Sequence, residues 1–374
     1  MKFPQILSFQ IFLLCLFLIT GCDDEDLLVA TEVDETSSFT EHPSSVDPYR
    51  RVFNMHRVDD RLVVQGEGEH LLIDADGQTI RRVSRTEETF VEAISDNYRL
   101  RRLGNRIELL GSGFDEFSNM EQTYLNLWSD ESEVIIPAER TYYWSSVACI
   151  GNGGKYLVPF ILASDPHLKF AVGQTTFNGQ LPAFGVLAPT VDTQTVICHP
   201  EEEAFYPFNG INMIPVESGF LFSRQSASSG FIVERISNEG EISEVLSTWT
   251  DQVFNFDSNL YATHYQDFGI LTILRGDARG ENWTQAYSIP NPNNQSFKFF
   301  PVGSDLFVSS ANNGLMYHVT EMSADRISFE ALDLANLSTY TVTDVEEHNG
   351  TIYIGTLSGL FTRDYNEFRD SRAE

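Results

Sequence analysis

Short apolar strands bounded by turn dipeptides recur along this chain and limit the folds open to it. In the clearest copy, apolar and polar residues alternate over 351–354, with Asn349-Gly350 before them and Ser358-Gly359 after them. A period of two between turn residues indicates a β-strand within a hairpin. Weaker copies occur upstream, so the globular part is predicted to consist of repeated antiparallel sheets.

The spacing of these turns predicts the architecture. Seven hairpins can be placed between Asp60 and Asn349, so six intervals cover 289 residues, a mean of about 48. Repeats of roughly this length with four short strands each are typical of a β-propeller. We therefore predict an all-β fold, a seven-bladed β-propeller over residues 51–369, with six or eight blades as alternatives.

Two further observations bear on this fold. The last repeat shows about three strands, so a strand from within residues 28–53 is expected to complete it. Turns every 8 to 12 residues or so would also suit a pair of β-sandwiches. The recurrence of a two-turn unit and the lack of a convincing long amphipathic helix in the sequence favour the propeller.

The first 22 residues have the pattern of a targeting segment. Lys2 precedes an apolar run over residues 9–19, which is too short to span a bilayer and is followed by Gly21-Cys22. This ending resembles the bacterial lipobox. The resemblance implies a lipoprotein signal peptide over residues 1–21 and lipidation of Cys22, so that acyl chains would hold the mature protein at a membrane. A plain secretory signal with an incidental cysteine is the alternative.

An acidic stretch follows the cysteine. Asp23-Asp24-Glu25-Asp26 resembles the surface-export signal of Bacteroidota lipoproteins, which implies display on the outer face of the outer membrane; the periplasmic face is the alternative. Nine acids and no Lys or Arg lie between Cys22 and Tyr49. Low hydrophobicity with like charge predicts a disordered tether over residues 22–50.

The charge of the chain excludes one class of partner. The formal net charge is −30, from 54 acids against 24 bases. Such a surface repels nucleic acid and anionic lipid headgroups, so no nucleic acid is expected to bind. An acidic composition is also common in proteins from salty environments.

Two cysteines and one aromatic cluster are candidate site residues. Cys149 and Cys198 are available to form a disulfide in an oxidising compartment, and two unpaired buried thiols are the alternative. The consecutive residues Tyr142, Tyr143 and Trp144 could stack on a sugar if they are exposed, although packing between blades would also explain them.

No residue cluster indicates a catalytic, metal or cofactor site. Asp74-Ala75-Asp76-Gly77 begins like a calcium loop, but Arg85 stands where the last acidic ligand would be needed, which favours a plain turn. Cys198 and His199 are adjacent, and adjacent strand residues point to opposite faces, so they are not expected to act as a nucleophile and base. The eight histidines show no metal-binding spacing.

These observations lead to a functional hypothesis. Residues 354–356 and 359–361 resemble repeats of sensor-type propellers of bacterial extracellular proteins. This resemblance supports the predicted fold and does not indicate a function. We expect a monomeric, lipid-anchored cell-envelope propeller that binds a protein or glycan partner without catalysis. A propeller hydrolase or lyase acting on sugars or lactones is one alternative. Another is a periplasmic scaffold of outer-membrane assembly, which this chain resembles in plan but without its Gly-Trp repeat motif.

Overall fold

The structure is a computed structural model of the chain, and two units are distinguished in it, Met1–Ser38 and Phe39–Glu374. The residues that it describes are 38–43, 51–58, 60–66, 69–84, 92–95, 98–103, 106–111, 122–125, 134–135, 149–151, 154–162, 164–177, 189–199, 212–226, 230–246, 250–265, 269–290, 296–310, 314–323 and 326–372. All of them except Ser38 belong to the second unit.

The described residues of this unit are mostly β-strands. In chain order they form β1 (Thr40–Glu41), β2 (Val52–Val58), β3 (Arg61–Gly66), β4 (Glu69–Ile73), β5 (Thr79–Ser84), β6 (Glu92–Ser95), β7 (Tyr98–Leu103), β8 (Arg106–Gly111), β9 (Gln122–Leu125), β10 (Val134–Ile135), β11 (Cys149–Ile150), β12 (Lys155–Leu162), β13 (Asp165–Phe177), β14 (Pro189–Cys198), β15 (Asn212–Val216), β16 (Gly219–Ser226), β17 (Gly230–Ser237), β18 (Ile242–Leu246), β19 (Thr250–Phe256), β20 (Asn259–Tyr265), β21 (Ile270–Gly276), β22 (Trp283–Pro290), β23 (Phe297–Val302), β24 (Asp305–Ser310), β25 (Met316–Met322), β26 (Ile327–Ala331), the 3-10 turn η4 (Ala335–Leu337), β27 (Val342–His348), β28 (Thr351–Thr356), β29 (Gly359–Asp364) and the helix α2 (Tyr365–Asp370).

These strands form seven antiparallel sheets, which we number from the N-terminus. They are sheet 1 (β2 to β5), sheet 2 (β6 to β9), sheet 3 (β10 to β14), sheet 4 (β15 to β18), sheet 5 (β19 to β22), sheet 6 (β23 to β26) and sheet 7 (β27, β28, β29 and β1). Sheet 3 has five strands, because β10 and β11 both pair with β12, and each of the other sheets has four.

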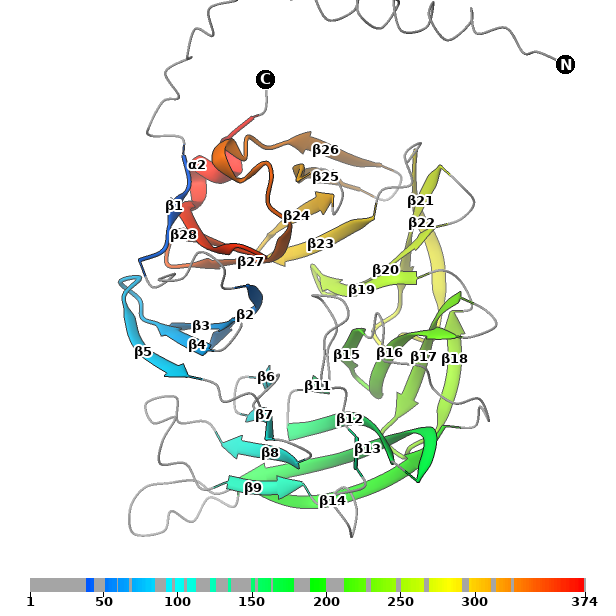
Figure 1. Cartoon of the computed structure of the whole chain (residues 1–374). Helices are drawn as coiled ribbons and strands as arrows, with labels where there is room; N and C mark the ends of the chain where they lie inside the picture. Colours follow the sequence, from blue (N-terminus) through cyan, green and yellow to red (C-terminus); the bar gives the residue numbers. More distant parts are fainter. Residues whose placement is uncertain are drawn as a thin grey trace, which may run out of the picture. The chain divides into compact units, whose positions relative to one another are not determined.

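The sheets surround a common centre, and their innermost strands are β2, β6, β11, β15, β19, β23 and β27 (Figure 1). Neighbouring sheets contact each other through these innermost strands: β27 contacts β2 and β23, β19 contacts β23 and β15, and β11 contacts β15 and β6. A ring of four-stranded antiparallel meanders is a β-propeller, as the sequence predicts. The number of blades in the whole chain stays a prediction.

Sheet 7 combines strands from both ends of the unit. In the pairing of β1 with β29, Thr40 lies opposite Thr362 and Glu41 opposite Phe361. This confirms the expectation that a strand from within residues 28–53 completes the last repeat. The same two residues lie inside the range 22–50 predicted as a tether, so at this point the chain is part of a sheet.

Three of the turns between third and fourth strands share their chemistry. The side chain of Asp74 accepts hydrogen bonds from the backbone N–H groups of Asp76 and Gln78, at 3.0 and 2.8 Å. Ser237 and Asp277 bond the N–H groups two and four residues later in the same way. A glycine with positive φ, which a side chain would strain, stands three residues after each: Gly77, Gly240 and Gly280. The sequence Asp74 to Gly77 is therefore a turn, as predicted.

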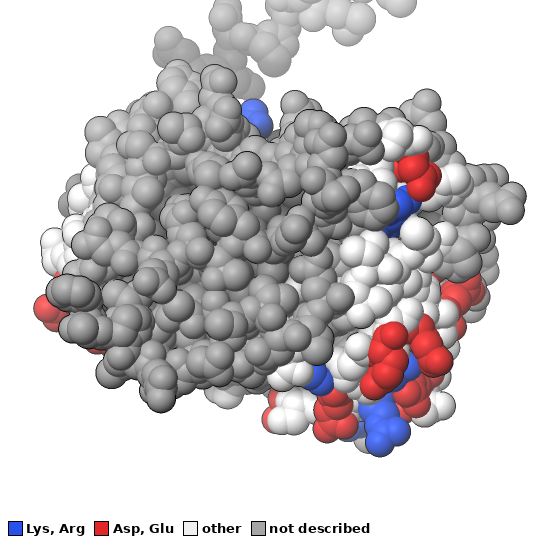
Figure 2. All heavy atoms as spheres, turned by 90° about the horizontal axis from the view of Figure 1, so that it is seen from below, with Lys and Arg blue, Asp and Glu red and all other residues white. Residues whose placement is uncertain are grey.

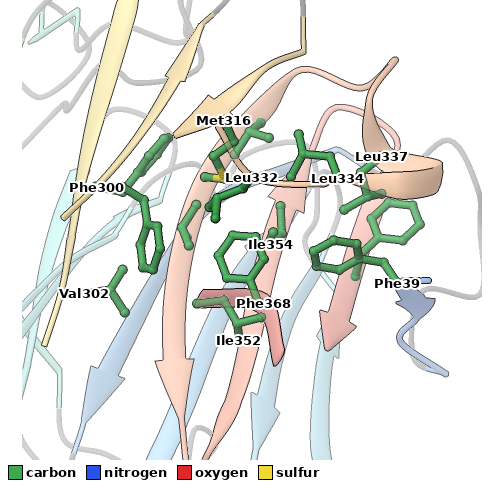
Figure 3. Packing of buried hydrophobic residues seen from close by; sticks show 14 residues of the cluster. Phe39, Phe300, Val302, Met316, Leu332, Leu334, Leu337, Ile352, Ile354 and Phe368 are labelled. Carbon is green, nitrogen blue, oxygen red and sulfur yellow. The ribbon is translucent and has the colours of Figure 1, made fainter. Parts of the chain in front are cut away.

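One buried cluster joins sheets 6 and 7 to the first and last described segments of the unit (Figure 3). Phe39, which precedes β1, lies with its ring centroid 5.7 Å from that of Phe368 in α2. Phe368 in turn lies 5.2 Å from Phe307 of sheet 6. The Asn336 side chain bonds both the N–H and the carbonyl of Phe39, at 3.1 and 3.0 Å. The two ends of the unit are thus fixed on one core.

Charged residues lie together on the described surface (Figure 2). Ion pairs join Arg235 to Glu281 at 3.3 Å and Arg372 to Glu330 at 2.6 Å. Exposed pairs of this kind contribute little to stability. Because acids outnumber bases by so many in the sequence, pairing leaves a large negative excess.

Candidate functional site

Several residues singled out in the sequence lie outside the described residues. They are Cys22, the lipidation candidate, and the sugar-stacking candidates Tyr142, Tyr143 and Trp144. Lipidation and stacking by these residues therefore stay predictions.

The structure does not bring Cys149 and Cys198 together. Both are free thiols, Cys149 buried on β11 and Cys198 exposed on β14. These are the first and last strands of the β11-β12-β13-β14 order, and neighbouring strands lie about 4.8 Å apart. Disulfide bonding requires Cα atoms within about 7 Å, so the predicted bond is not formed here. Burial raises the pKa of the Cys149 thiol to about 12, which makes it unreactive at neutral pH.

His199 also has a structural partner. Its Nε2 lies 2.8 Å from Glu234 Oε1 on β17, and both side chains are buried between sheets 3 and 4. Cys198 beside it is exposed, so the two do not form a nucleophile and base pair. Within the described ranges, no group of three or more His, Cys, Asp or Glu residues is arranged to hold a metal ion.

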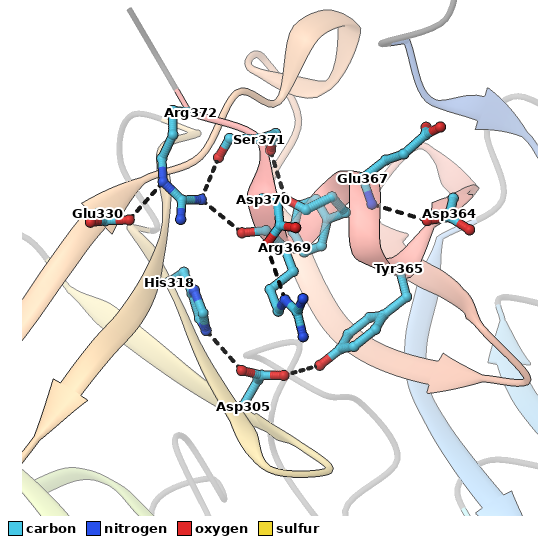
Figure 4. A network of polar contacts seen from close by, with 11 residues as sticks. Asp305, His318, Glu330, Asp364, Tyr365, Glu367, Arg369, Asp370, Ser371 and Arg372 are labelled. Carbon is cyan, nitrogen blue, oxygen red and sulfur yellow. Dashed lines mark hydrogen bonds and ion pairs between the residues drawn. The ribbon is translucent and has the colours of Figure 1, made fainter.

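A polar network fixes the C-terminal helix on sheet 6 (Figure 4). Asp305 at the start of β24 lies 2.9 Å from His318 Nε2 and accepts a hydrogen bond from the Tyr365 hydroxyl. Burial and this carboxylate raise the pKa of Tyr365. Asp364 caps α2 by accepting from the Glu367 N–H at 3.0 Å. The contacts account for the position of the helix.

The innermost strand of sheet 7 carries two carboxyl groups on one face. Asp344 accepts a hydrogen bond from the Met55 N–H at 2.6 Å, which joins β27 to β2. Glu346 is two residues further on; burial and the nearby Asp344 raise the pKa of its carboxyl to about 8, and Arg57 lowers it in part. A carboxylic acid that stays partly protonated at neutral pH can donate a hydrogen bond, but nothing else described here converges on it.

An apolar pocket opens between sheets 5 and 6. Its buried floor is formed by Leu271, Phe299 and Val308, each 1% exposed. Its rim is formed by side chains that are half-buried or exposed: Ile289, Pro290, Phe297, Tyr317 and Phe329. We call this the inter-sheet pocket.

The two sheets are held together at both sides of the pocket. On the innermost strands, the Gln252 side chain bonds the N–H and the carbonyl of Phe299, each at 2.8 Å. On the outer side, the Tyr287 hydroxyl on β22 donates to the carbonyl of Ser323, which directly follows β25, at 2.5 Å. The Phe254 ring stacks on Phe299, with centroids 5.0 Å apart and an interplanar angle of 8°. A pocket between such fixed walls is preformed.

The size and lining of the pocket limit what can occupy it. Its volume is about 210 Å³. Cofactors and drug-sized ligands generally need about 300 Å³ or more, whereas an apolar cavity of about 150 Å³ holds benzene. The Tyr317 hydroxyl is the polar side-chain group among the lining residues. The pocket therefore suits a single aromatic or branched apolar group.

The sequence contains the strands of this pocket but does not reveal the pocket itself. The run from Phe297 to Val302 indicates a strand with apolar residues on both faces. Which face meets Leu271 or Tyr317 depends on how two repeats pack together. No local pattern carries that information.

Comparisons with known proteins found similar solved structures but no matching family. No protein-family model matches the sequence, and no curated protein matches it significantly. Similar solved structures include the β-propeller domain of Cps50 (Swd1) from Myceliophteria thermophila, with 11% identity, a TM-score of 0.47 and coverage of 84% of this chain and 98% of that one.

Two bacterial structures are similar to the same degree. BamB from Moraxella catarrhalis has 11% identity and a TM-score of 0.47, covering 83% of this chain and 84% of that one. Apo AztD from Citrobacter koseri has 11% identity and a TM-score of 0.46, covering 86% and 84%. The propeller assignment itself rests on the sheet topology described above.

Among the residues that the structure describes, no helix has the length and apolarity to cross a bilayer.

Proposed function

We propose that this protein is a non-catalytic binding module of the cell envelope, and that the inter-sheet pocket receives an apolar side chain of a partner protein. The observation that carries the proposal is the pocket itself, with its buried apolar floor and accessible rim. Interfaces commonly depend on a few such anchors, in which one side chain fills a pocket and is fully desolvated.

The lining favours a polypeptide over a glycan. A sugar in this pocket would bury hydroxyl groups against Leu271, Phe299 and Val308, which offer no side-chain hydrogen-bond partner. Buried hydroxyls without partners cost about 1–3 kcal/mol each, whereas an apolar side chain gains by leaving water. The occupant is therefore an aromatic or branched side chain.

The charge of the chain indicates which residues should lie beside that side chain in the partner. With a net charge of −30, the protein attracts positively charged partners over distances of about a Debye length, roughly 8 Å at physiological ionic strength. Lys or Arg residues beside the apolar anchor would speed association and favour this partner over acidic ones. We propose an apolar anchor flanked by basic residues.

The lipobox-like ending at Cys22 supports a place for this module at a membrane. We propose that acyl chains on Cys22 hold the protein at the outer membrane and that the acidic tether displays the propeller on the cell surface. The binding face would then be available to extracellular or envelope proteins.

The binding proposal is tested by photo-crosslinking in intact cells with the full-length chain. A crosslinking amino acid at Ile289, on the rim, is expected to give a discrete adduct. The same group at Ile80, which is 48% exposed on β5 of sheet 1, gives none. The adduct should be lost with a second substitution, Phe329→Asp, because a charge at the rim opposes entry of an apolar side chain.

Ile327→Asp is the matched control. Ile327 lies two residues before Phe329 on the same face of the same strand and is also half-buried, but it does not line the pocket. Both substitutions add one negative charge and disturb the same cluster. Retention of the adduct in Phe329→Asp, or its equal loss in both variants, would contradict pocket-dependent binding.

A further inference from the structure

The inter-sheet pocket has two chemically different walls. The wall on sheet 6 carries four aromatic side chains, which come from β23, β25 and β26: Phe297, Phe299, Tyr317 and Phe329. The wall on sheet 5 is aliphatic and consists of Leu271, Ile289 and Pro290. A side chain that enters the pocket therefore contacts aromatic rings on one side and aliphatic groups on the other.

Two of the four rings stand at a large angle to each other. The centroids of Tyr317 and Phe329 lie 6.4 Å apart, and their planes meet at 77°. A guest ring that lies parallel to one of them is therefore nearly perpendicular to the other. Offset stacking and edge-to-face contact are the two arrangements that aromatic pairs prefer, because the negative face of one ring attracts the positive edge of another. A single guest ring can thus satisfy both preferences.

An aliphatic guest gains less from the aromatic wall. Contacts between rings add to the free energy gained by burying apolar area, whereas a leucine or a saturated ring gains the area contribution alone. For this reason a phenyl ring should bind roughly 2- to 12-fold more tightly than a saturated ring of the same carbon skeleton. The wall therefore selects aromatic side chains over branched aliphatic ones.

The floor of the pocket distinguishes phenylalanine from tyrosine. A tyrosine that enters ring first carries its hydroxyl to the floor, where Leu271, Phe299 and Val308 are each 1% exposed. These side chains are apolar, and the Gln252 side chain already bonds the backbone N–H and carbonyl of Phe299. A hydroxyl buried there without a partner should lower the affinity roughly fivefold or more.

We propose that the partner side chain received by the inter-sheet pocket is phenylalanine, and that Tyr317 and Phe329 select its ring. This inference rests on the proposed function, because it names the side chain that the pocket receives. The pocket volume of about 210 Å³ accommodates a phenyl ring, since an apolar cavity of about 150 Å³ holds benzene.

The test compares short basic peptides that differ in one central side chain. The probe is Lys-Lys-Phe-Lys-Lys, and its central residue is replaced by cyclohexylalanine, leucine, tyrosine or alanine. Each peptide is titrated by NMR against the full-length chain with Cys22→Ala, which carries no acyl chains and needs no detergent. We expect the phenylalanine peptide to bind roughly 2- to 12-fold more tightly than the cyclohexylalanine peptide, and roughly fivefold or more tightly than the tyrosine peptide.

A substitution in the aromatic wall gives the second measurement. Phe329→Leu removes one ring and keeps the pocket apolar, so the preference for phenylalanine over cyclohexylalanine should decrease. Phe256→Leu is the matched control, because Phe256 is half-buried in the same cluster but does not line the pocket. The control should keep the full preference.

The outcomes separate this inference from the proposed function. Equal binding of the phenylalanine peptide and the cyclohexylalanine or tyrosine peptide overturns the choice of phenylalanine. If these peptides still bind more tightly than the alanine peptide, which measures the effect of charge alone, the pocket does receive an apolar side chain. Equal binding of all five peptides overturns both proposals. A full preference retained in Phe329→Leu overturns the selecting role of the aromatic wall.

Discussion

Glu346 lies on the innermost strand of sheet 7, where its carboxyl group is difficult to ionise. Burial and the neighbouring Asp344 raise its pKa from 4.5 to about 8. The folded protein therefore holds this proton more tightly than the unfolded chain does between these two values. The contribution of this group to the free energy of unfolding is fully present below pH 4.5 and is lost as the pH rises toward 8, by up to about 1.4 kcal/mol per pH unit.

Glu346→Gln should remove this pH dependence, because glutamine keeps the shape and cannot ionise. We expect the variant to exceed the wild type in melting temperature at pH 8.5, and the difference to be much smaller at pH 5. Thermal unfolding at the two pH values is the measurement. Glu244→Gln, at an exposed position on β18, is the control. Its melting temperature should differ from that of the wild type by the same amount at pH 5 and at pH 8.5. An equal effect of Glu346→Gln at both pH values would rule out this origin of the pH dependence.

At the scale of single elements, the strands and tight turns could be predicted because their signals are local. Asn349 and Gly350 both adopt positive φ, 50° and 81°, which is the conformation that a short hairpin turn needs and that these two residue types tolerate. The predicted pairing of residues 351–354 with their neighbours is found in β28.

Features that depend on distant packing could not be predicted in this way. Cys149 and Cys198 both lie in apolar strand patterns, and only the strand order shows that two strands separate them. The floor of the inter-sheet pocket combines Leu271 with Phe299 and Val308 from the next sheet. Whether the pocket forms depends on how closely two repeats approach each other. No residue pattern in the sequence indicates that distance.

The helix α2 is predicted to stabilise the propeller through Phe368. This side chain is fully buried against Phe39 and Phe307, so Phe368→Ala leaves a cavity in the cluster shared by sheets 6 and 7. We expect a loss of about 3–5 kcal/mol in the free energy of unfolding, measured with denaturant. Glu367→Ala, at an exposed position of the same helix, should change it by less than about 0.5 kcal/mol. Similar effects of both variants would show that the helix does not contribute through this contact.

At the scale of the whole molecule, the position of β1 relates the proposed anchor to the fold. The second unit begins at Phe39, and β1 completes sheet 7 beside the C-terminal strand β29. A tether attached here would leave the inter-sheet pocket, which lies between sheets 5 and 6, on other elements of the propeller. Anchoring and binding would then use different parts of the chain.

The central claim, a binding module displayed at the cell surface by a lipid on Cys22, is tested most directly by adding protease to intact cells and following the protein by immunoblot. We predict that the wild-type protein is cleaved on unbroken cells and fractionates with the outer membrane, and that Cys22→Ala loses this membrane association because no acyl chains hold it. Protection of the wild type until the outer membrane is opened would contradict surface display and favour a periplasmic scaffold. Unchanged membrane association of Cys22→Ala would contradict the lipid anchor.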